Sequence, residues 1–312
     1  NEQTITFTTS EPLLCPAVYR GTVDYILKRA RSKKVTVVTT TNGVSLSGEL
    51  RDFIVERISD TFRLNISLDG MQKSHDSHRK CAGQRTASAF KLSWGHFSRL
   101  PKDKVRVIMT ASPGESIDLK EDVDFILRNG FRKVDLFPRM FFLWRKEDLP
   151  LLRSGLEGAV KSFNEQRGKG YDLRLLDRLW GGSCSAKVLL GSDGQFYLFE
   201  GVLALPYAKR KRYVLGDSIQ GLDLHRRLEA WASLRADMGR HCERCCGCEH
   251  ERFCAYPAAL FVWCRQKRKD FKTYLANFCS LAEMLIEVSG AVTPEIKNQG
   301  DSVKTARCLR RF

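Results

Sequence analysis

The chain has 312 residues, 43 % of them hydrophobic and 28 % charged, a balance typical of globular proteins and a length typical of two domains. No apolar stretch approaches the roughly 20 residues of a membrane-spanning helix, so the sequence predicts no membrane span. The net charge of +16 favours acidic partners, although a solvated basic surface also explains it. Eleven cysteines, an odd number without a recognisable secretion signal, predict a reducing cytoplasmic location where thiolates hold a metal or cluster.

The first 140 residues alternate between short β-branched segments and segments of helical length. The expected strands are Thr4–Thr8, Val35–Thr39, Leu64–Leu68, Val105–Thr110 and Lys133–Phe137. The expected helices are Pro16–Lys33, Ser47–Ile58, Thr86–Arg99 and Ser116–Asn129. Strand–helix–strand repeats of about 30 residues are typical of βαβ units, and they predict a parallel sheet that is open or part of a barrel.

The sequence pattern changes near Gly181, where we expect a domain boundary. Two helices are expected before it, at Leu151–Gln166 and Leu173–Trp180. After it we expect a hairpin of Ala186–Leu190 and Gln195–Phe199 around Ser192-Asp193-Gly194, and then a helix near Leu222–Met238. The sequence thus predicts domains at 1–180 and 181–290, followed by a polar tail at 291–312.

Polar loops follow the first three expected strands. They read Thr9-Ser10-Glu11-Pro12, Thr41-Asn42-Gly43 and Ser67-Leu68-Asp69-Gly70. Each loop alone is explained by ordinary turn chemistry. The carboxyl ends of parallel strands share one edge, however, and α/β proteins place their ligand sites there. Three such loops in succession therefore predict a binding site.

Five cysteines lie within the fourteen residues 241–254, which read HCERCCGCEHERFC. Cys242, Cys245 and Cys248 form two overlapping Cys-x2-Cys pairs, a spacing that brings two sulfurs to one metal centre. A zinc ribbon needs a second, separate pair about 15–20 residues later, which is missing, so this layout fits zinc poorly. Two other cysteines sit among apolar residues and are expected to pack in a core: Cys15 and Cys264.

These motifs together resemble the radical S-adenosylmethionine enzymes with a C-terminal SPASM domain, a group that includes sulfatase-maturing enzymes and peptide maturases. In that family the three loops read G-G-E-P, T-N-G and S-L-D-G, and the third is followed by H-D-x-x-R. The chain matches the last motif with His75-Asp76-Ser77-His78-Arg79. The resemblance covers about residues 4–285. It implies an α/β fold: a partial (β/α)6 radical-SAM-type barrel that lacks its first unit, followed by a small cysteine-rich α+β SPASM-type domain.

The resemblance implies S-adenosylmethionine as a cofactor. Its binding residues would be Ser10, Glu11, Pro12, Asn42, Ser67, Asp69 and Arg79. The first three would position the amino group, and Ser67 and Arg79 would hold the carboxylate or ribose. Asp69 and Asp76 have an alternative role as turn residues. Thr9-Ser10 replaces the family's Gly-Gly, which leaves the ligand less room beside the backbone.

The resemblance also implies one auxiliary [4Fe–4S] cluster. Its thiolates would be Cys245, Cys248, Cys254 and Cys279. A second auxiliary cluster is not expected, because Phe199 and Ala258 occupy two of its cysteine positions. Two cysteines are left without an assigned role: Cys184 and Cys242.

The Cys-x3-Cys-x2-Cys loop that holds the family's radical cluster occurs nowhere in the chain. In the family this loop precedes the first matched strand. The chain is therefore expected to be either a fragment of a maturase or a degenerate member that only binds peptide. A complete enzyme would form a 5′-deoxyadenosyl radical, which abstracts hydrogen from a peptide or protein, with electrons from a reductant protein.

The basic segment Lys209–Arg212 is the densest group of positive charges in the sequence and indicates the kind of partner. It favours an acidic substrate through salt-sensitive attraction. The remaining alternative, a zinc-stapled nucleic-acid-binding protein, is disfavoured because the segment lacks interleaved aromatic residues.

Overall fold

The structure is a computed structural model of the chain. It describes residues 3–8, 11–30, 34–81, 84–113, 118–166, 170–175, 188–199, 202–203, 205–239 and 256–289. The chain forms two compact units: unit 1 comprises Asn1–Arg139 and Arg145–Leu175, and unit 2 comprises Met140–Trp144 and Leu176–Phe312. Among the described helices, none combines the length and the apolar character needed to cross a bilayer.

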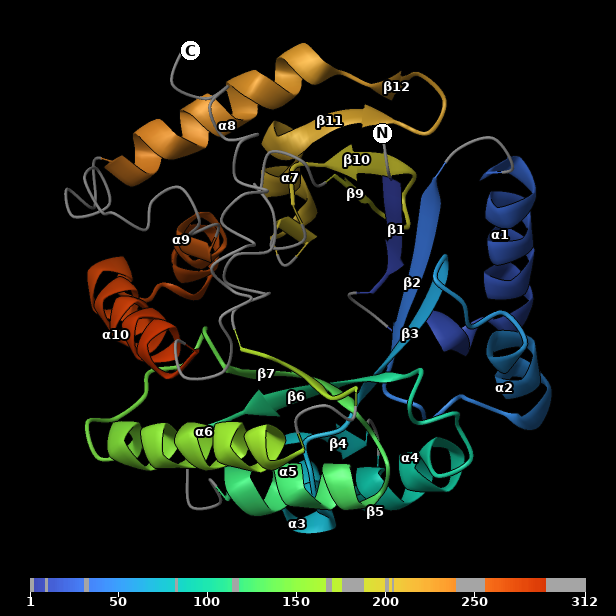
Figure 1. Cartoon of the computed structure of the whole chain (residues 1–312). Helices are drawn as coiled ribbons and strands as arrows, with labels where there is room; N and C mark the ends of the chain where they lie inside the picture. Colours follow the sequence, from blue (N-terminus) through green and yellow to red (C-terminus); the bar gives the residue numbers. More distant parts are fainter. Residues whose placement is uncertain are drawn as a thin grey trace. The chain divides into compact units, whose positions relative to one another are not determined.

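Unit 1 is built on a six-stranded sheet in which every neighbouring pair is parallel (Figure 1). The strands, in spatial order, are β1 (Gln3–Phe7), β2 (Val35–Thr41), β3 (Phe62–Ser67), β6 (Arg106–Ala111), β7 (Lys133–Pro138) and β8 (Asp172–Arg174). Val37, Ile66 and Val107 on the central strands are fully buried. The strand register places these three side chains on the same face of the sheet, because successive side chains of a strand point to opposite faces.

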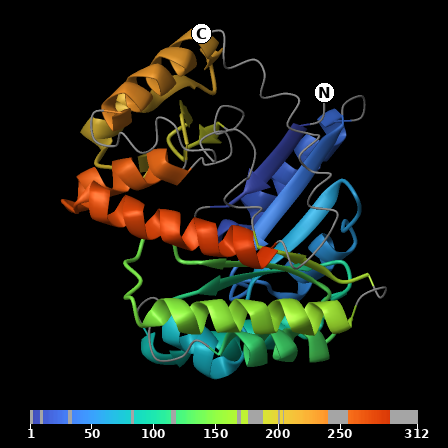
Figure 2. The ribbon, with the colours of Figure 1, turned by 60° about the vertical axis from the view of Figure 1, so that its left-hand side comes forward.

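Helices connect these strands and lie against one face of the curved sheet (Figures 1 and 2). They are α1 (Pro16–Arg29), α2 (Gly48–Val55), α3 (Gln72–His78), α4 (Ala89–Phe97), α5 (Leu119–Arg128) and α6 (Asp148–Glu165). A 3-10 helix, η1 (Pro12–Leu14), precedes α1, and a two-stranded hairpin of β4 (Lys80–Cys81) and β5 (Gln84–Ser88) precedes α4. The βαβ alternation expected from the sequence is therefore confirmed.

The expected elements of unit 1 differ from the observed ones mainly at their ends. The expected helix at Thr86–Arg99 begins only at Ala89, because the Ser88 hydroxyl accepts the Lys91 N–H as an N-cap. The expected helix at Leu173–Trp180 is wrong over its first residues, because Leu173 pairs with Val134 in a parallel strand. Residues 176–180 lie outside the described part.

Unit 2 contains a four-stranded antiparallel sheet and three longer helices. The strands are β9 (Leu189–Leu190), β10 (Gln195–Tyr197), β11 (Val214–Asp217) and β12 (Gly221–Leu222). The helices are α7 (Tyr207–Arg210), the 3-10 helix η5 (Lys211–Tyr213), α8 (Leu224–Gly239), α9 (Tyr256–Lys267) and α10 (Phe271–Ser289). The expected hairpin is confirmed as β9–β10, and Gly194 in its turn has φ 75°.

The two cysteines expected in a core behave differently. Cys264 in α9 is fully buried, as expected. The expectation for Cys15 is wrong, because its side chain is exposed at the junction of η1 and α1. Its apolar neighbours Leu14 and Val18 are exposed too, at 68 % and 71 %. Apolar neighbours in sequence therefore did not indicate burial at this position.

Candidate functional site

Glu11 joins the loop after β1 to the loop after β2. Its Oε1 accepts the Thr41 hydroxyl at 2.8 Å and the Leu13 N–H at 3.1 Å, and its Oε2 accepts the Asn42 N–H at 2.7 Å. The Asn42 side-chain oxygen accepts the Val44 N–H at 2.9 Å. Both side chains therefore use their oxygens to shape the two loops, and Pro12 begins η1 directly after Glu11.

Gly43 fixes the second loop against α4. It has φ 79°, and a Cβ added there would lie 2.1 Å from a ring carbon of Phe97. Phe97 is fully buried in α4. The glycine is therefore required both by the left-handed backbone and by the close approach of the aromatic ring.

Asp69, which follows β3 after Leu68, forms a bidentate ion pair with Arg79. Its Oδ2 accepts Nε of Arg79 at 2.6 Å, and its Oδ1 accepts Nη2 at 3.0 Å. Oδ1 also accepts the Thr110 N–H at the end of β6, at 2.9 Å. Asp69 is 2 % exposed, whereas the Arg79 side chain is 28 % exposed. The carboxylate therefore holds the guanidinium in a fixed orientation while part of it faces outward.

His75 and Asp76 hold the helix that carries Arg79. His75 is 2 % exposed, and its Nδ1 accepts the Asp69 N–H at 3.3 Å. Burial lowers the pKa of His75 to about 4, so the imidazole is neutral at pH 7. The Asp76 carboxylate accepts the Ser88 hydroxyl at 2.6 Å and the Phe90 N–H at 2.8 Å. Both residues stabilise the connection from α3 to α4.

Gly70 brings the third loop against a buried carboxylate of α5. It has φ 98°, and an added Cβ would lie 2.2 Å from Oδ1 of Asp122. The same oxygen accepts the Met71 N–H at 2.7 Å. Asp122 is 1 % exposed, and burial raises its pKa to about 6. Asp122 therefore leaves no space for a side chain at position 70.

A second arginine lies in the same cluster. Arg139 follows β7 directly, and its N–H donates to the Ala111 carbonyl at 2.8 Å. Burial lowers the pKa of Arg139, the charge of Asp69 raises it, and the like charge of Arg79 lowers it further. Two guanidiniums thus share the field of one carboxylate. Asp69, Arg79 and Arg139 together carry one net positive charge, which suits an anionic ligand group.

The structure brings most of the expected cofactor-binding residues to this edge. Ser67 is the last residue of β3, half-buried, and Glu11, Asn42, Asp69 and Arg79 follow their strands as expected. Sequence reasoning missed Thr110 and Arg139. Arg139 lies two residues after the expected strand Lys133–Phe137, so the rule that selected the other loops also selects it. Thr110 acts through its backbone N–H, for which a sequence carries no signal.

The expected cluster ligands fall mostly outside the described residues. Ser10 and Cys245, Cys248 and Cys254 lie there, as do Cys184 and Cys242. Cys279 is half-buried in α10. Among the residues that the structure does describe, no three His, Cys, Asp or Glu side chains gather as a metal site.

The fold is similar to that of anSMEcpe, a radical SAM enzyme with a SPASM domain. Structures of anSMEcpe are among those that match, and "Native anSMEcpe with bound AdoMet" has a TM-score of 0.55 and 16 % identity over 94 % of this chain and 86 % of that one. "Native anSMEcpe with bound AdoMet and Cp18Cys peptide" has a TM-score of 0.57 and 16 % identity over 94 % and 87 %. No family model and no curated protein sequence matches the chain. At this identity the likeness establishes the fold.

Proposed function

We propose that the chain is the barrel and SPASM part of a radical SAM maturase that modifies a peptide or protein. The fold supports this proposal, since the similar structures are described as binding AdoMet and, in two cases, a peptide as well. The observation that carries it is the Asp69–Arg79 pair at the carboxyl edge of the parallel sheet. That edge is where α/β proteins bind ligands.

The charge and geometry of this edge fit the carboxylate of S-adenosylmethionine. Asp69 binds Nε and Nη2 of Arg79, so Nη1 is the nitrogen that would meet a ligand carboxylate. A guanidinium is the strongest side-chain partner for a carboxylate. Arg139 adds a second positive charge, and the Ser67 hydroxyl adds a polar contact. Because both oxygens of Glu11 already bind Thr41 and Asn42, Glu11 acts on the ligand's amino group by positioning the first loop.

The exposed edge of unit 1 supports a barrel that continues beyond β1. Four of the five residues of Gln3–Phe7 are exposed, and within the described residues β1 pairs only with β2. On η1 and α1, Leu14, Val18 and Tyr25 are 68 %, 71 % and 60 % exposed. An unpaired strand edge and an exposed apolar helix face are features that another element normally covers. We infer that a further βα unit, carrying the radical cluster, packs there.

The second half of the proposal concerns iron and sulfide. We place one auxiliary [4Fe–4S] cluster on Cys245, Cys248, Cys254 and Cys279, within a SPASM-type domain at 181–290. When both clusters and S-adenosylmethionine are bound, the chemistry supplied is one-electron reductive cleavage. The described residues contribute by holding the carboxylate of the cofactor and by fixing the loops around it.

A degenerate, peptide-binding member of the family is the second candidate function. The observation that favours it is the absence of any Cys-x3-Cys-x2-Cys spacing in the sequence. With dithionite, this chain alone is therefore expected to form no 5′-deoxyadenosine detectable by mass spectrometry. Robust turnover would show that a radical-cluster site exists within the chain.

The proposed cofactor site is tested by S-adenosylmethionine binding to the anaerobically reconstituted chain, measured by equilibrium dialysis. Arg79→Met is expected to weaken binding by at least about tenfold, because a charge-assisted pair is lost. Arg63→Met is the control, since Arg63 is exposed on β3, the strand that precedes Asp69. Equal affinity of both variants would refute the site. Stoichiometric zinc without inorganic sulfide would refute the cluster.

A further inference from the structure

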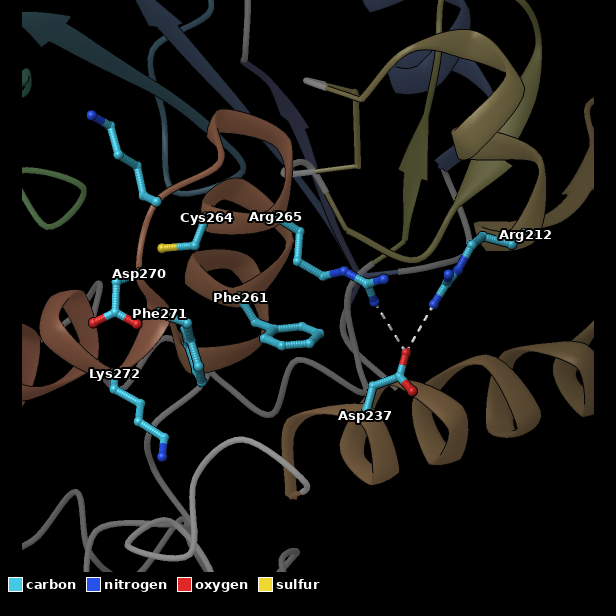
Figure 3. Close-up of a pocket in the computed structure, with 9 residues that line it drawn as sticks. Arg212, Asp237, Phe261, Cys264, Arg265, Asp270, Phe271 and Lys272 are labelled. Carbon is cyan, nitrogen blue, oxygen red and sulfur yellow. Dashed lines mark hydrogen bonds and ion pairs between the residues drawn. The ribbon is translucent and has the colours of Figure 1, made fainter.

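A cavity of about 660 Å³ lies within unit 2 (Figure 3). Its walls come from η5, α8, α9 and the start of α10, so four separate elements shape it. This volume is in the range of sites that bind small molecules or a few side chains. The residues that line it differ from those at the sheet edge of unit 1.

Two aromatic rings form the apolar part of the cavity. Phe261 of α9 and Phe271 of α10 meet edge-to-face, with ring centroids 5.1 Å apart. They are 2 % and 8 % exposed, and the fully buried Cys264 lies beside them. This part of the wall is therefore rigid and suits an apolar group.

On one side of the cavity, one carboxylate is shared by two guanidiniums. Asp237 of α8 lies 3.1 Å from Nη2 of Arg212 and 3.5 Å from Nη1 of Arg265. The two arginines approach it from different elements, as Figure 3 shows. The Arg212 and Arg265 side chains are 47 % and 58 % exposed, whereas the Asp237 side chain is 18 % exposed. This trio retains one net positive charge that reaches solvent.

On the other side, the second carboxylate is occupied by the helix that follows it. Asp270 accepts the Thr273 N–H at 3.0 Å and also the Thr273 hydroxyl, so it caps α10. These hydrogen bonds lower the pKa of Asp270, and the bond from the Thr273 hydroxyl has the largest effect, so the carboxylate stays ionised. Lys269 and Lys272 flank it. Four cations thus line the cavity against two committed carboxylates, an excess of two positive charges.

The turn that presents Lys269 is held in an unfavourable backbone conformation. Arg268 has φ 53°, the one positive φ outside glycine in the described part of the chain. The Lys269 N–H donates to the Cys264 carbonyl at 2.9 Å, which closes a Schellman-type end of α9. Glycine is the usual residue at such a position. The α9–α10 turn therefore keeps a strained geometry that places two lysines and the N-terminus of α10 at one cavity.

We propose that this cavity binds an acidic segment of a peptide substrate, with its carboxylates near Arg265, Lys269 or Lys272 and an apolar side chain beside Phe261 and Phe271. The proposal rests on the proposed peptide-modifying function and names its substrate class. A nucleic acid fits less well. Its stacking platforms need exposed aromatic faces, and its repeated phosphates would also meet the two carboxylates of the cavity.

The test uses the full chain and a fluorescein-labelled decapeptide of alternating glutamate and leucine, with binding followed by fluorescence anisotropy at low salt. The double variant Lys269→Gln/Lys272→Gln is expected to weaken binding by about tenfold or more. The control, Lys267→Gln/Arg226→Gln, removes two charges from exposed sites outside the cavity lining. It is expected to change the affinity by less than about threefold. Thermal unfolding of both variants checks that they fold.

The proposal is overturned if the control variant, or Lys209→Gln/Lys211→Gln, weakens peptide binding as much as Lys269→Gln/Lys272→Gln does. It is also overturned if a glutamine–leucine peptide binds with the same affinity as the glutamate–leucine peptide. Complete displacement of the peptide by inorganic phosphate or by an oligonucleotide would overturn it as well. As a second measurement, carbodiimide coupling joins a bound carboxylate to a neighbouring amine. Mass spectrometry is expected to find the peptide on Lys269 or Lys272, and scattered coupling would contradict the site.

The same variants separate this proposal from the proposed function. Lys269→Gln/Lys272→Gln is expected to bind S-adenosylmethionine as the parent chain does. Loss of peptide affinity with unchanged cofactor binding supports the cavity. Failure of the parent to bind S-adenosylmethionine, with peptide binding intact, would refute the cofactor site alone.

Discussion

Removing Arg79 from the Asp69–Arg79 pair is expected to destabilise unit 1 more than removing Asp69. Arg79→Met removes the guanidinium from the Asp69 carboxylate, which is 2 % exposed and keeps its hydrogen bond from the Thr110 N–H. Breaking a buried pair in this way costs about 3–5 kcal/mol, and we expect about 3 kcal/mol here because Arg79 is partly solvated. Asp69→Asn keeps an oxygen for the Thr110 N–H and leaves Arg79 access to water, so we expect about 1–2 kcal/mol.

A double variant, Asp69→Asn/Arg79→Met, tests the same geometry. The double variant, which has no buried charge, is expected to be more stable at pH 7 than Arg79→Met alone.

Native-state hydrogen exchange with mass spectrometry measures this effect in unit 1 alone. Peptides that cover β3 and β6 report the opening free energy of the sheet, which a global unfolding curve of two units does not isolate. The reasoning is wrong if Asp69→Asn is the more damaging change, or if the double variant shows the sum of the two single effects.

Three further predictions concern other positions. In the parent chain, ionisation of the buried Asp122 is expected to remove about 2 kcal/mol of unit 1 stability as the pH rises from 4 through its pKa of about 6, and Asp122→Asn is expected to abolish this loss. Hydrogen exchange of peptides that cover α5, compared at several pH values, measures the difference. Gly43→Ala is expected to destabilise by about 3 kcal/mol through overpacking, whereas Gly95→Ala, with open space inside α4, is expected to stabilise by about 0.5–1 kcal/mol. Cys248→Ala is expected to abolish the brown absorbance of the reconstituted protein and its roughly four irons, and Cys264→Ala is expected to keep both.

The strand–helix alternation of unit 1 was predictable because its signal is local. β2 reads VTVVTTT and is buried along most of its length, and the neighbouring strands carry similar runs. β8 was missed because its stability comes from partners distant in sequence. Arg106 of β6 binds Asp172 across 66 positions, and without that partner the segment resembles a helix.

The candidate site was predictable only as a set of loops. The rule that ligands bind at the carboxyl ends of parallel strands selected Glu11, Asn42 and Asp69. Their individual contacts were not predictable, because each depends on which distant group meets the side chain. The sequence left Asp69 either a cofactor ligand or a turn residue, and the structure gives it Arg79 and the Thr110 N–H as partners.

The carboxylate of Glu11 makes the conformations of the first two loops depend on each other. A change of Thr41 to a residue without a hydroxyl removes one of the donors that hold Glu11, and a change of Glu11 leaves the Asn42 N–H without its acceptor. In related sequences the residues at positions 11 and 41 are therefore expected to vary together. An engineer who grafts one of these loops from a relative would need to transfer both as one cassette.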